Sequence, residues 1–322
     1  PPAPPEKFPE ILGQSPAIQQ IFSALQKTAA TDSTVLITGE SGTGKELVAR
    51  ALHNLSPRQK MPFIAIHCGA LPEQLLESEM FGHKRGSFTG AFSDKKGLFE
   101  EAEGGSVFLD EIGTMPMSLQ AKILRFLQDK ELRRVGDNAT HRVNVRVIAA
   151  SNENLEEKTK LGAFREDLFY RLSVIALELP PLRDRPTDVP ALVTHFLKQF
   201  SKGLGIEPPE MLPETMRFLQ SYRWPGNVRE LQNAIERAVT FSNRKQLTPD
   251  DLPARVRRRD AEAQPGLAIR PLKDVVREFE QEYCAKALKL AHGDRRVASH
   301  MLRISLPSFY RKLPPGAGET NR

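Results

Sequence analysis

A glycine-rich segment, GESGTGKE at residues 39–46, has the composition and spacing of a phosphate-binding loop. Glycines let backbone N–H groups surround phosphate oxygens, the following helix N-terminus adds positive charge, and the lysine reaches the β- and γ-phosphates. The apolar run STVLIT precedes the segment and a helical pattern follows it, so the required strand–loop–helix context is present. The pattern predicts ATP binding by Gly39, Glu40, Ser41, Gly42, Thr43, Gly44, Lys45 and Glu46. Glu46 stands where Ser or Thr would ligate Mg²⁺, so metal ligation there needs a different account.

Two adjacent acids, Asp110 and Glu111, end the apolar run VFL. A strand delivers both carboxylates to the sheet edge that carries the phosphate loop. There Asp110 can hold the Mg²⁺ shell and Glu111 can polarise the attacking water. A charge pair at a helix N-terminus is the alternative, and the independent phosphate-loop pattern disfavours it.

Phosphoryl transfer also needs positive charge on the far side of the γ-phosphate. The segment FREDLFYRL at residues 164–172 offers Arg165 and Arg171, six residues apart and close to one face of a predicted helix. Spacing alone leaves open a solvated helix face in which these arginines pair with Glu166 and Asp167.

The elements that position these residues follow an alternating pattern. Short apolar runs at 33–38, 62–67, 105–109, 145–151 and 174–179 predict strands, with amphipathic helices such as 118–129 between them. This alternation predicts an α/β fold with a parallel sheet covered on both faces. After Pro180 and Pro181 the strands are expected to stop, and residues 188–252 predict a compact helical subdomain.

Composition limits the remaining function classes. No apolar run of the 322 residues approaches the roughly 20 needed to span a bilayer, which predicts no membrane partner. Two distant cysteines give neither a disulfide framework nor a metal spacing, which favours a reducing cytoplasm. From Arg255 onward there are 15 Lys and Arg against 8 Asp and Glu, so this basic tail predicts a polyanionic partner.

The basic tail carries the pattern of a helix-turn-helix at residues 293–313. A long helix, 272–291, is expected before it, with one apolar face made by Leu272, Val275, Val276, Phe279 and Tyr283. Asp294 can cap the next helix, RIS forms the turn, and Pro307 suits the first position of the last helix. The side chains expected to point inward are Val297, Ala298, Met301, Leu302, Phe309 and Leu313. The residues expected to contact DNA are Arg295, Ser308, Arg311 and Lys312. A three-helix docking domain is the alternative.

Taken together, these motifs resemble those of the bacterial enhancer-binding proteins, the NtrC-like AAA+ activators of sigma-54 RNA polymerase. The resemblance covers nearly the whole chain, from ILGQSPAIQQI to a C-terminal segment similar to a Fis-type DNA-binding domain. GESGTGKE and GSVFLDEIG resemble the family's Walker A and Walker B segments. VIAASN resembles sensor I, with Asn152 as the polar reader, and WPGNVREL resembles sensor II, which implies that Arg229 lies over the nucleotide. The segment with Arg165 and Arg171 resembles the family's arginine fingers, which act on the ATP of a neighbouring subunit.

The segment GHKRGSFTGAFSD, residues 82–94, has no apolar period, and its glycines predict a loop. Its central part resembles the family's GAFTGA signature, which contacts sigma-54. The resemblance implies this role for Gly86, Ser87, Phe88, Thr89, Gly90 and Ala91. We expect the side chains of Phe88 and Thr89 to be exposed.

Two positions depart from the family pattern. Ser87 replaces an alanine, a small-for-small change. His67, at the end of the second strand, replaces an asparagine that holds the Walker B glutamate away until the partner engages. Histidine can also hydrogen-bond a carboxylate, with an added dependence on its protonation. A merely packed strand-end residue is the alternative interpretation of His67.

The resemblance implies an ATP- and Mg²⁺-dependent cytoplasmic transcription activator of the two-component type. It would assemble as a ring, expected to be a hexamer, bind enhancer DNA and remodel sigma-54 polymerase. A DNA-binding repressor that uses ATP only to control assembly is the alternative, and Glu111 with both arginines argues against it. The expected divisions of the chain are 1–9 linker with further sequence upstream, 10–180 AAA+ α/β subdomain, 181–254 helical lid, 255–271 linker, 272–313 DNA-binding domain and 314–322 tail.

Overall fold

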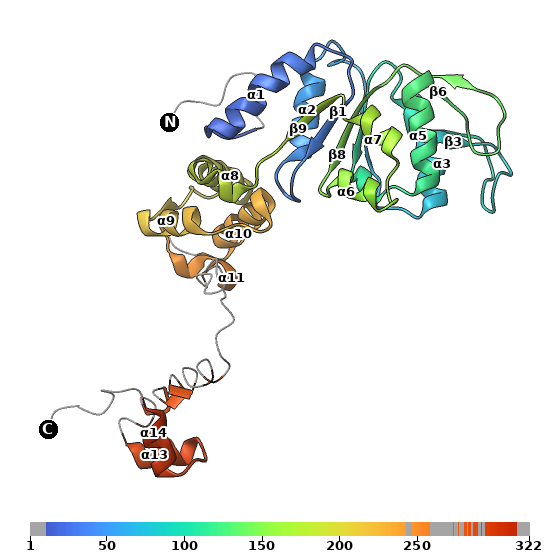
Figure 1. Cartoon of the computed structure of the whole chain (residues 1–322). Helices are drawn as coiled ribbons and strands as arrows, with labels where there is room; N and C mark the ends of the chain where they lie inside the picture. The colour runs from blue at the N-terminus through green and yellow to red at the C-terminus, as the bar shows by residue number, and fades with distance from the viewer. Residues whose placement is uncertain are drawn as a thin grey trace. The chain divides into compact units, whose positions relative to one another are not determined.

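The computed structural model describes residues 11–242, 246–257 and 294–313, together with individual residues between 273 and 291. The chain forms two compact units, Pro1–Arg259 and Asp260–Arg322. Figure 1 traces the chain through both units. The first unit holds the predicted α/β subdomain and the helical lid.

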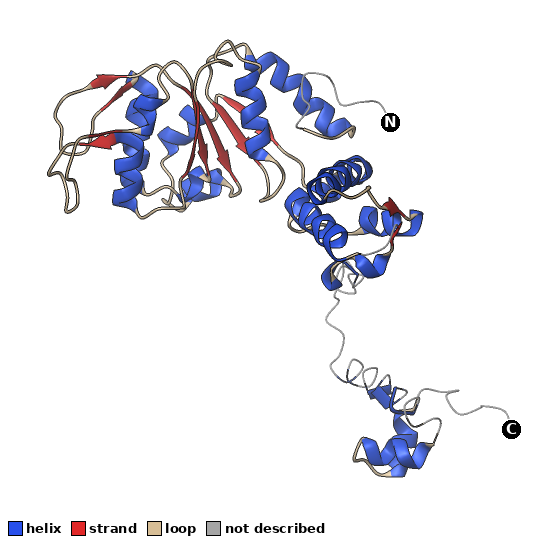
Figure 2. Cartoon of the chain, turned by 180° about the vertical axis from the view of Figure 1, so that it is seen from behind, coloured by secondary structure: helices blue, strands red, loops and turns tan. Residues whose placement is uncertain are grey.

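The α/β subdomain is built on a five-stranded parallel sheet with the order β2-β5-β8-β1-β9. Its strands are β1 (Val35–Thr38), β2 (Phe63–His67), β5 (Ser106–Asp110), β8 (Arg146–Ser151) and β9 (Ile175–Glu178). Every neighbouring pair runs parallel, which brings all the carboxyl ends to one edge (Figure 2). The five predicted strands and the predicted parallel sheet are confirmed.

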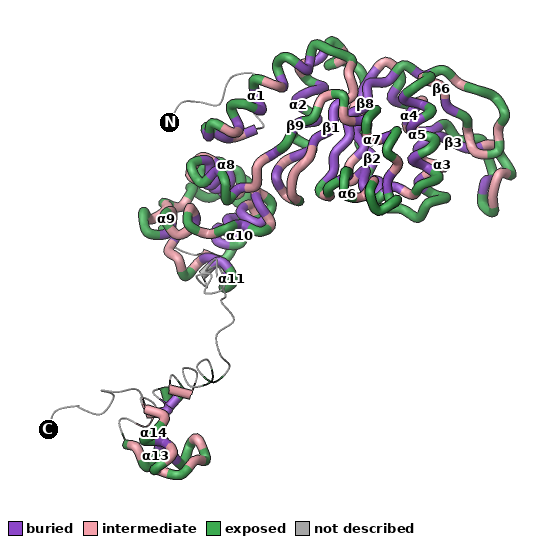
Figure 3. The backbone as a smooth tube through the Cα atoms, in the orientation of Figure 1, coloured by how far each residue is buried: buried purple, intermediate pink, exposed green. Residues whose placement is uncertain are grey.

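Helices cover both faces of this sheet (Figure 1). They are α1 (Pro16–Ala29), α2 (Lys45–Asn54), α3 (Glu73–Phe81), α4 (Leu98–Glu101), α5 (Met117–Asp129), α6 (Leu155–Lys160) and α7 (Glu166–Leu172). The sheet separates two apolar clusters: α1 and α2 pack on Val35 and Ile37, whereas α3 and α5 pack on the side of Leu36. Because alternate side chains of a strand point to opposite faces, β1 is buried on both sides (Figure 3).

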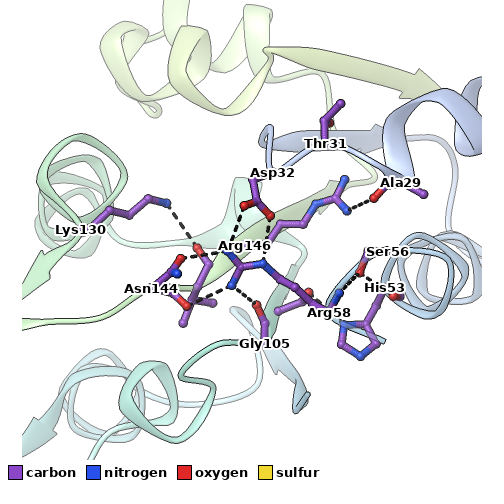
Figure 4. A network of polar contacts seen from close by, with 12 residues as sticks. Ala29, Thr31, Asp32, His53, Ser56, Arg58, Gly105, Lys130, Asn144 and Arg146 are labelled. Carbon is purple, nitrogen blue, oxygen red and sulfur yellow. Dashed lines mark hydrogen bonds and ion pairs between the residues drawn. The ribbon is translucent and has the colours of Figure 1, made fainter. Parts of the chain in front are cut away.

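Two arginines tie together the amino edge of the sheet, opposite the phosphate loop (Figure 4). Arg58 donates to both carboxylate oxygens of Asp32, at 2.9 and 3.1 Å. It also donates to the carbonyl oxygen of Gly105 and to both oxygens of Asn144. Arg146, only 1% exposed, donates to the carbonyl oxygens of Thr28 and Ala29 at the C-terminal end of α1. These bonds join the segments that enter β1, β5 and β8.

The helical lid follows β9. It contains α8 (Val189–Leu204), α9 (Pro213–Ser221), α10 (Asn227–Phe241) and α11 (Ala254–Arg257), packed around the fully buried Trp224. Two findings differ from the sequence-based expectation. A short parallel pair, β10 (Glu210–Met211) with β11 (Gln246–Leu247), lies within the lid, so strands do not stop at β9. The helix α11 continues past the expected boundary at residue 254 because Val256 is buried in the lid core.

In the second unit, α13 (Arg295–Met301) and α14 (Leu306–Lys312) are the two helices expected there, and the turn between them has four residues, Leu302–Ser305, one more than the expected RIS. Asp294 caps α13 by accepting from the N–H groups of Arg296 and Val297. Ser305 caps α14, so Pro307 is its second residue, one position later than expected.

The core of the second unit differs in part from the expected inward face. It contains Cys284, Ala287, Ala298 and Phe309, with Leu302 and Leu313 packed against it. The inward positions expected for Val297 and Met301 were wrong, because these side chains are 48% and 54% exposed. Val276 and Tyr283, from the expected apolar face of the preceding helix, are also exposed, at 45% and 55%. Small residues take the inward positions, so the larger neighbours on adjoining turns face outward. Leu272, Val275 and Phe279 lie outside the described residues.

Candidate functional site: a phosphate cleft between sheet and lid

The phosphate loop joins β1 to α2, and its backbone requires glycine at two positions. Gly42 and Gly44 have φ angles of 78° and 104°, a region that side chains with a Cβ rarely adopt. A Cβ at Gly42 would also lie 2.4 Å from the carbonyl oxygen of Gly226 in the lid. The glycines therefore allow the lid backbone to approach the loop directly.

Lys45 opens α2 and is buried against the loop. Its Nζ donates to the carbonyl oxygens of Gly39 at 2.8 Å and Glu40 at 3.0 Å. Burial lowers the pKa of Lys45, while the carboxylates of Asp110 and Glu111 act in the opposite direction. The ammonium group therefore lies between the loop and the two acids, where it can neutralise a phosphate chain.

Asp110 and Glu111 stand at the carboxyl end of β5. Asp110 Oδ1 accepts a hydrogen bond from the N–H of Glu111 at 3.0 Å, and Glu111 has a left-handed φ of 52°. His67 ends the adjacent strand β2 in register with Asp110. Its Nε2 lies 3.7 Å from Glu111 Oε2. The structure thus places His67 beside the Walker B glutamate, the neighbour that the sequence predicted for it.

The lid closes one side of the site through the start of α10. The N–H groups of Val228 and Arg229 donate to the carbonyl oxygen of Gly42 at 3.0 and 3.3 Å. The Arg229 guanidinium donates to Ser41 Oγ at 3.1 Å. Arg229 therefore lies against the phosphate loop; its place over a nucleotide, which the resemblance implies, stays a prediction.

These groups line one cleft of about 520 Å³. The predicted residues that line it are Ser41, Gly42, Gly44, Lys45, Glu46, His67, Asp110, Glu111 and Arg229. A second, more apolar cleft of about 380 Å³ adjoins it and shares Gly44, Leu47, Val228 and Gln232. Apolar clefts with a few polar groups are typical of sites that bind small molecules, and this one has the size for a flat base.

No pattern in the sequence predicted this second cleft. Its walls come from Ile11 and Leu12 before α1, from Leu192 and Phe196 of α8, and from the polar Arg185. The apolar face of α8 was visible in the sequence, but only the docking of the lid brings it beside α2.

Glu46 does not face the metal position. Its carboxylate accepts from Arg50 one turn along α2, at 2.7 Å. The described residues hold no cluster of three or more His, Cys, Asp or Glu that could bind a metal alone. Mg²⁺ in nucleotide sites usually binds one or two carboxylates plus phosphates and waters, so Asp110 fits as its protein ligand.

Of the predicted site residues, Gly39, Glu40 and Thr43 belong to the phosphate loop but do not line the cleft, and three others lie in separate elements. Arg165 is the N-cap of α7 rather than a helical residue, and it pairs with Asp167 at 2.7 Å. Arg171 is exposed in the last turn of α7, and Asn152 is exposed just after β8. None of the three lines the phosphate cleft as the described residues form it.

The GSFTGA segment is a loop, as predicted, and its base is closed. An antiparallel pair, β3 (Gly82–His83) with β4 (Lys95–Lys96), begins and ends it. Gly86 N–H donates to Ala91 O at 2.9 Å. Lys84 pairs with Asp94 at 2.7 Å. The loop therefore projects from a fixed stem.

The expected exposure of Phe88 was wrong, whereas Thr89 is exposed as expected. Phe88 is half-buried because its ring meets the His83 ring edge-on, with centroids 5.0 Å apart. His83 is itself buried and hydrogen-bonds Ser78 Oγ through Nδ1. The freely exposed aromatic of this segment is Phe92, at 87%.

In the second unit, the predicted DNA contacts lie on or beside α14. Arg311 is exposed, and Ser308 and Lys312 are half-exposed. Lys312 pairs with Glu280. The guanidinium of Arg295 lies 5.2 Å from the ring centre of Tyr310. Arg311 therefore presents the most accessible positive charge of the predicted set.

Comparison with known proteins agrees with the division into an α/β subdomain and a lid. The Sigma-54 interaction domain family matches residues 11–178, and the AAA+ ATPase lid domain family matches residues 183–268. The chain is 46% identical over 307 residues to the regulatory protein AtoC of Escherichia coli, covering 94% of this chain and 67% of AtoC. It is 39% identical to the DNA-binding transcriptional regulator NtrC of Proteus hauseri, covering 94% of this chain and 69% of NtrC.

Solved structures agree with the sequence comparison. NtrX from Brucella abortus, crystallised in complex with ATP, matches with a TM-score of 0.73 and 36% identity, covering 94% of this chain and 68% of NtrX. The chain spans between 46% and 69% of the length of its curated relatives. Within the residues that the structure describes, no helix is long and apolar enough to cross a membrane.

The parallel sheet, the phosphate loop and the helical lid define an AAA+ ATPase. The chain belongs to the sigma-54 interaction domain family of these ATPases, as the resemblance of its motifs predicted.

Proposed function

We propose that this chain hydrolyses ATP to remodel sigma-54 RNA polymerase and open promoters while it is bound to enhancer DNA. One observation carries this proposal. The phosphate loop, both Walker acids and a stem-held GSFTGA loop lie on one α/β subdomain, within the residues that match the sigma-54 interaction domain, and the lid completes the phosphate cleft through Val228, Arg229 and Gln232. In this proposal residues 10–180 and 181–254 form the cytoplasmic motor, and residues 272–313 bind DNA.

The chemistry assigned to the cleft follows from its geometry. The backbone of residues 39–46 and the ammonium group of Lys45 hold the phosphates, and the apolar cleft beside them holds the base. Asp110 would hold Mg²⁺, which would supply positive charge to the phosphates. Glu111 orients the attacking water, and His67, whose Nε2 lies 3.7 Å from Glu111 Oε2, stands where it can engage that carboxylate.

The separation of Arg165 and Arg171 from the cleft supports assembly into a ring. Phosphoryl transfer needs positive charge at the γ-phosphate, and neither arginine lines the described cleft of its own subunit. A neighbouring subunit in a hexameric ring would supply both. Asn152 then reads the nucleotide state at the end of β8.

The GSFTGA loop is the proposed contact with sigma-54. Its glycines at 86 and 90 have φ angles of 81° and 105°, so its tip can change shape while the stem stays fixed. Thr89 lies exposed between them.

The second unit is the proposed DNA reader. Arg311 and Ser308 on α14 and Arg295 on α13 would contact the groove, and Lys312 would join them if it leaves Glu280. A relative is named the response regulator protein PilR of Pseudomonas aeruginosa, which supports a place in a two-component system.

The decisive experiment measures promoter opening and ATP turnover together. The wild type should hydrolyse ATP and open a sigma-54 promoter. Lys45→Ala should lose nucleotide binding, and Glu111→Gln should bind ATP but turn it over at least 100-fold more slowly, as loss of a general base predicts. A wild type that binds DNA and assembles with ATP but never hydrolyses it would establish the repressor alternative.

A further inference from the structure

The side chain of Asn227 connects three segments that are far apart in sequence. Its Nδ2 donates to Glu40 Oε2 at 3.1 Å and to the carbonyl oxygen of Ser41 at 3.0 Å. Its Oδ1 accepts from the N–H of Leu182 at 2.8 Å. Asn227 is fully buried, and both polar atoms of its side-chain amide have partners, as buried polar groups normally do. It therefore joins the phosphate loop to the hinge segment after β9 and to the first turn of α10.

A paired charge lies beside this amide. The guanidinium of Arg183 donates to both carboxylate oxygens of Glu40, at 2.9 and 2.7 Å. The hydrogen bond from Arg183, and then that from Asn227, hold the pKa of Glu40 below its usual value. Glu40 is an acid within a phosphate-binding loop, where its charge would repel a nucleotide. Arg183 neutralises this carboxylate, and Glu40 does not line the described phosphate cleft.

The hinge segment holds the loop at a second point. Arg185, 3% exposed, donates to the carbonyl oxygen of Thr43 at 3.1 Å. Residues 182–185 therefore contact the phosphate loop on both sides of Gly42, at Glu40 and at Thr43. These contacts also fix the start of α10, whose Val228 and Arg229 N–H groups donate to Gly42.

We propose that Glu40, Arg183 and Asn227 form a clamp that couples the phosphate loop to the lid and positions Arg229 over the nucleotide. These three are positioning residues: they act through the loop and α10. The proposal deepens the ATPase function proposed above and rests on it. A movement of the loop on phosphate binding is passed to the hinge through these side chains. Glu40 and Arg183 are 143 residues apart in sequence, so their direct hydrogen bond is a far shorter connection than the chain between them.

A purely structural ion pair would behave differently. The side chains of Arg183 and Glu40 are 35% and 42% exposed, and ion pairs as exposed as this add little to stability. The clamp should therefore affect turnover and lid docking more than the melting temperature. Couplings between sites in proteins are typically about 5- to 150-fold.

The first test uses the nucleotide-free protein and needs no activity. Amide hydrogen exchange is measured at Val228 and Arg229 in the wild type, Arg183→Gln and Asn227→Asp. Asp at position 227 keeps the acceptor for Leu182 but loses both donors and faces Glu40 with a second negative charge. Exchange should accelerate about tenfold in Asn227→Asp and about threefold in Arg183→Gln, within the range of such couplings.

The second test reverses the donor and the acceptor. In the double variant Glu40→Gln with Asn227→Asp, the amide lies on residue 40 and the carboxylate on residue 227, so one hydrogen bond re-forms without like-charge repulsion. This double variant should recover exchange protection and kcat relative to Asn227→Asp alone. Glu79→Gln is the matched control, because Glu79 forms a partly exposed ion pair with Lys95 outside the cleft.

ATP turnover completes the test. Asn227→Asp should lower kcat about tenfold with less than a threefold change in nucleotide affinity, and Arg183→Gln should act in the same direction with an unchanged melting temperature. Wild-type exchange at Val228 and Arg229 in both single variants would overturn the clamp, as would a double variant no better than Asn227→Asp. A wild type without ATPase activity would refute the proposed function instead, and the exchange result would still judge the clamp.

Discussion

Replacing the two aromatic residues of the loop at residues 82–94, Phe88 and Phe92, should separate stability from function. The Phe88 ring meets the buried His83 ring edge-on, with the ring centroids 5.0 Å apart. Such a pair contributes about 0.5–1.5 kcal/mol beyond the apolar area that it buries. With partial burial of the ring added, Phe88→Ala should lower the free energy of unfolding by about 1–2 kcal/mol. In a unit of this size that corresponds to a fall of about 3–6 °C in the melting temperature.

Phe92 provides the matched control. It lies four residues away on the same loop, but 87% of it is exposed. Phe92→Ala should change stability by less than about 0.5 kcal/mol. Thr89→Ala should be equally silent, because Thr89 is exposed. The loop therefore offers one variant that weakens its stem and two that leave the fold intact.

The assay measures melting temperature, ATPase rate and sigma-54 binding on all three variants. Sigma-54 binding is measured with a transition-state mimic of ATP. Thr89→Ala should keep ATP binding, ring formation and much of the hydrolysis, yet fail to bind sigma-54 and to open a promoter. An unchanged melting temperature in Phe88→Ala would refute the stacking argument. Normal promoter opening by Thr89→Ala would refute the assignment of this loop to sigma-54.

Four further outcomes are expected. Arg171→Ala should abolish hydrolysis but spare nucleotide binding, and wild-type activity per subunit should rise steeply with protein concentration; constant activity from a proven monomer would contradict the ring. Arg146→Met should lower the free energy of unfolding, measured in urea, by about 1–3 kcal/mol, because the carbonyl oxygen of Ala29 loses the Arg146 donor while that of Thr28 keeps the N–H and hydroxyl of Thr31. Arg134 lowers the pKa of Glu100 through a hydrogen bond. The ionised carboxylate therefore stabilises the fold at pH values above its ordinary pKa of about 4.3, and this stabilisation is lost as the pH falls through the lower pKa that Glu100 has in the folded state. Glu100→Gln should therefore cost about 1–2 kcal/mol at pH 7 and flatten the acid-induced loss of stability. Arg311→Ala should weaken DNA binding and make it less dependent on salt, which a gel shift at several salt concentrations checks.

Local patterns predicted the sheet and the phosphate loop well. The strand β1 is a β-branched run that ends at a glycine, and the loop needs glycine at fixed positions. Both features can therefore be recognised from a few neighbouring residues of the sequence. The positions of Asp110 and Glu111 followed from these elements, whereas Arg229 was proposed only from the resemblance of WPGNVREL to sensor II. Their roles in hydrolysis remain predictions.

What the sequence did not reveal depends on contacts between distant residues. Phe88 is covered because the turn brings His83 beneath it, and no apolar period records such a contact. Two-residue strands such as β10 are too short to give a pattern. Asn227 adopts a left-handed φ of 52° within WPGNVREL, and its bonds to the phosphate loop span 186 and 187 residues. Only the docked lid makes this contact visible.

The bonds made by Arg58 bear on the order in which the protein folds. This one guanidinium bonds partners that are 26, 47 and 86 residues away in sequence. All three can be engaged only after the segments that lead into β1, β5 and β8 have come together, and contacts at such separation form late because closing long loops costs entropy. The bonds of Arg58 should therefore be absent from the folding transition state. Losing them would accelerate unfolding and leave the folding rate nearly unchanged, so this arginine governs how long the sheet persists rather than how fast it forms.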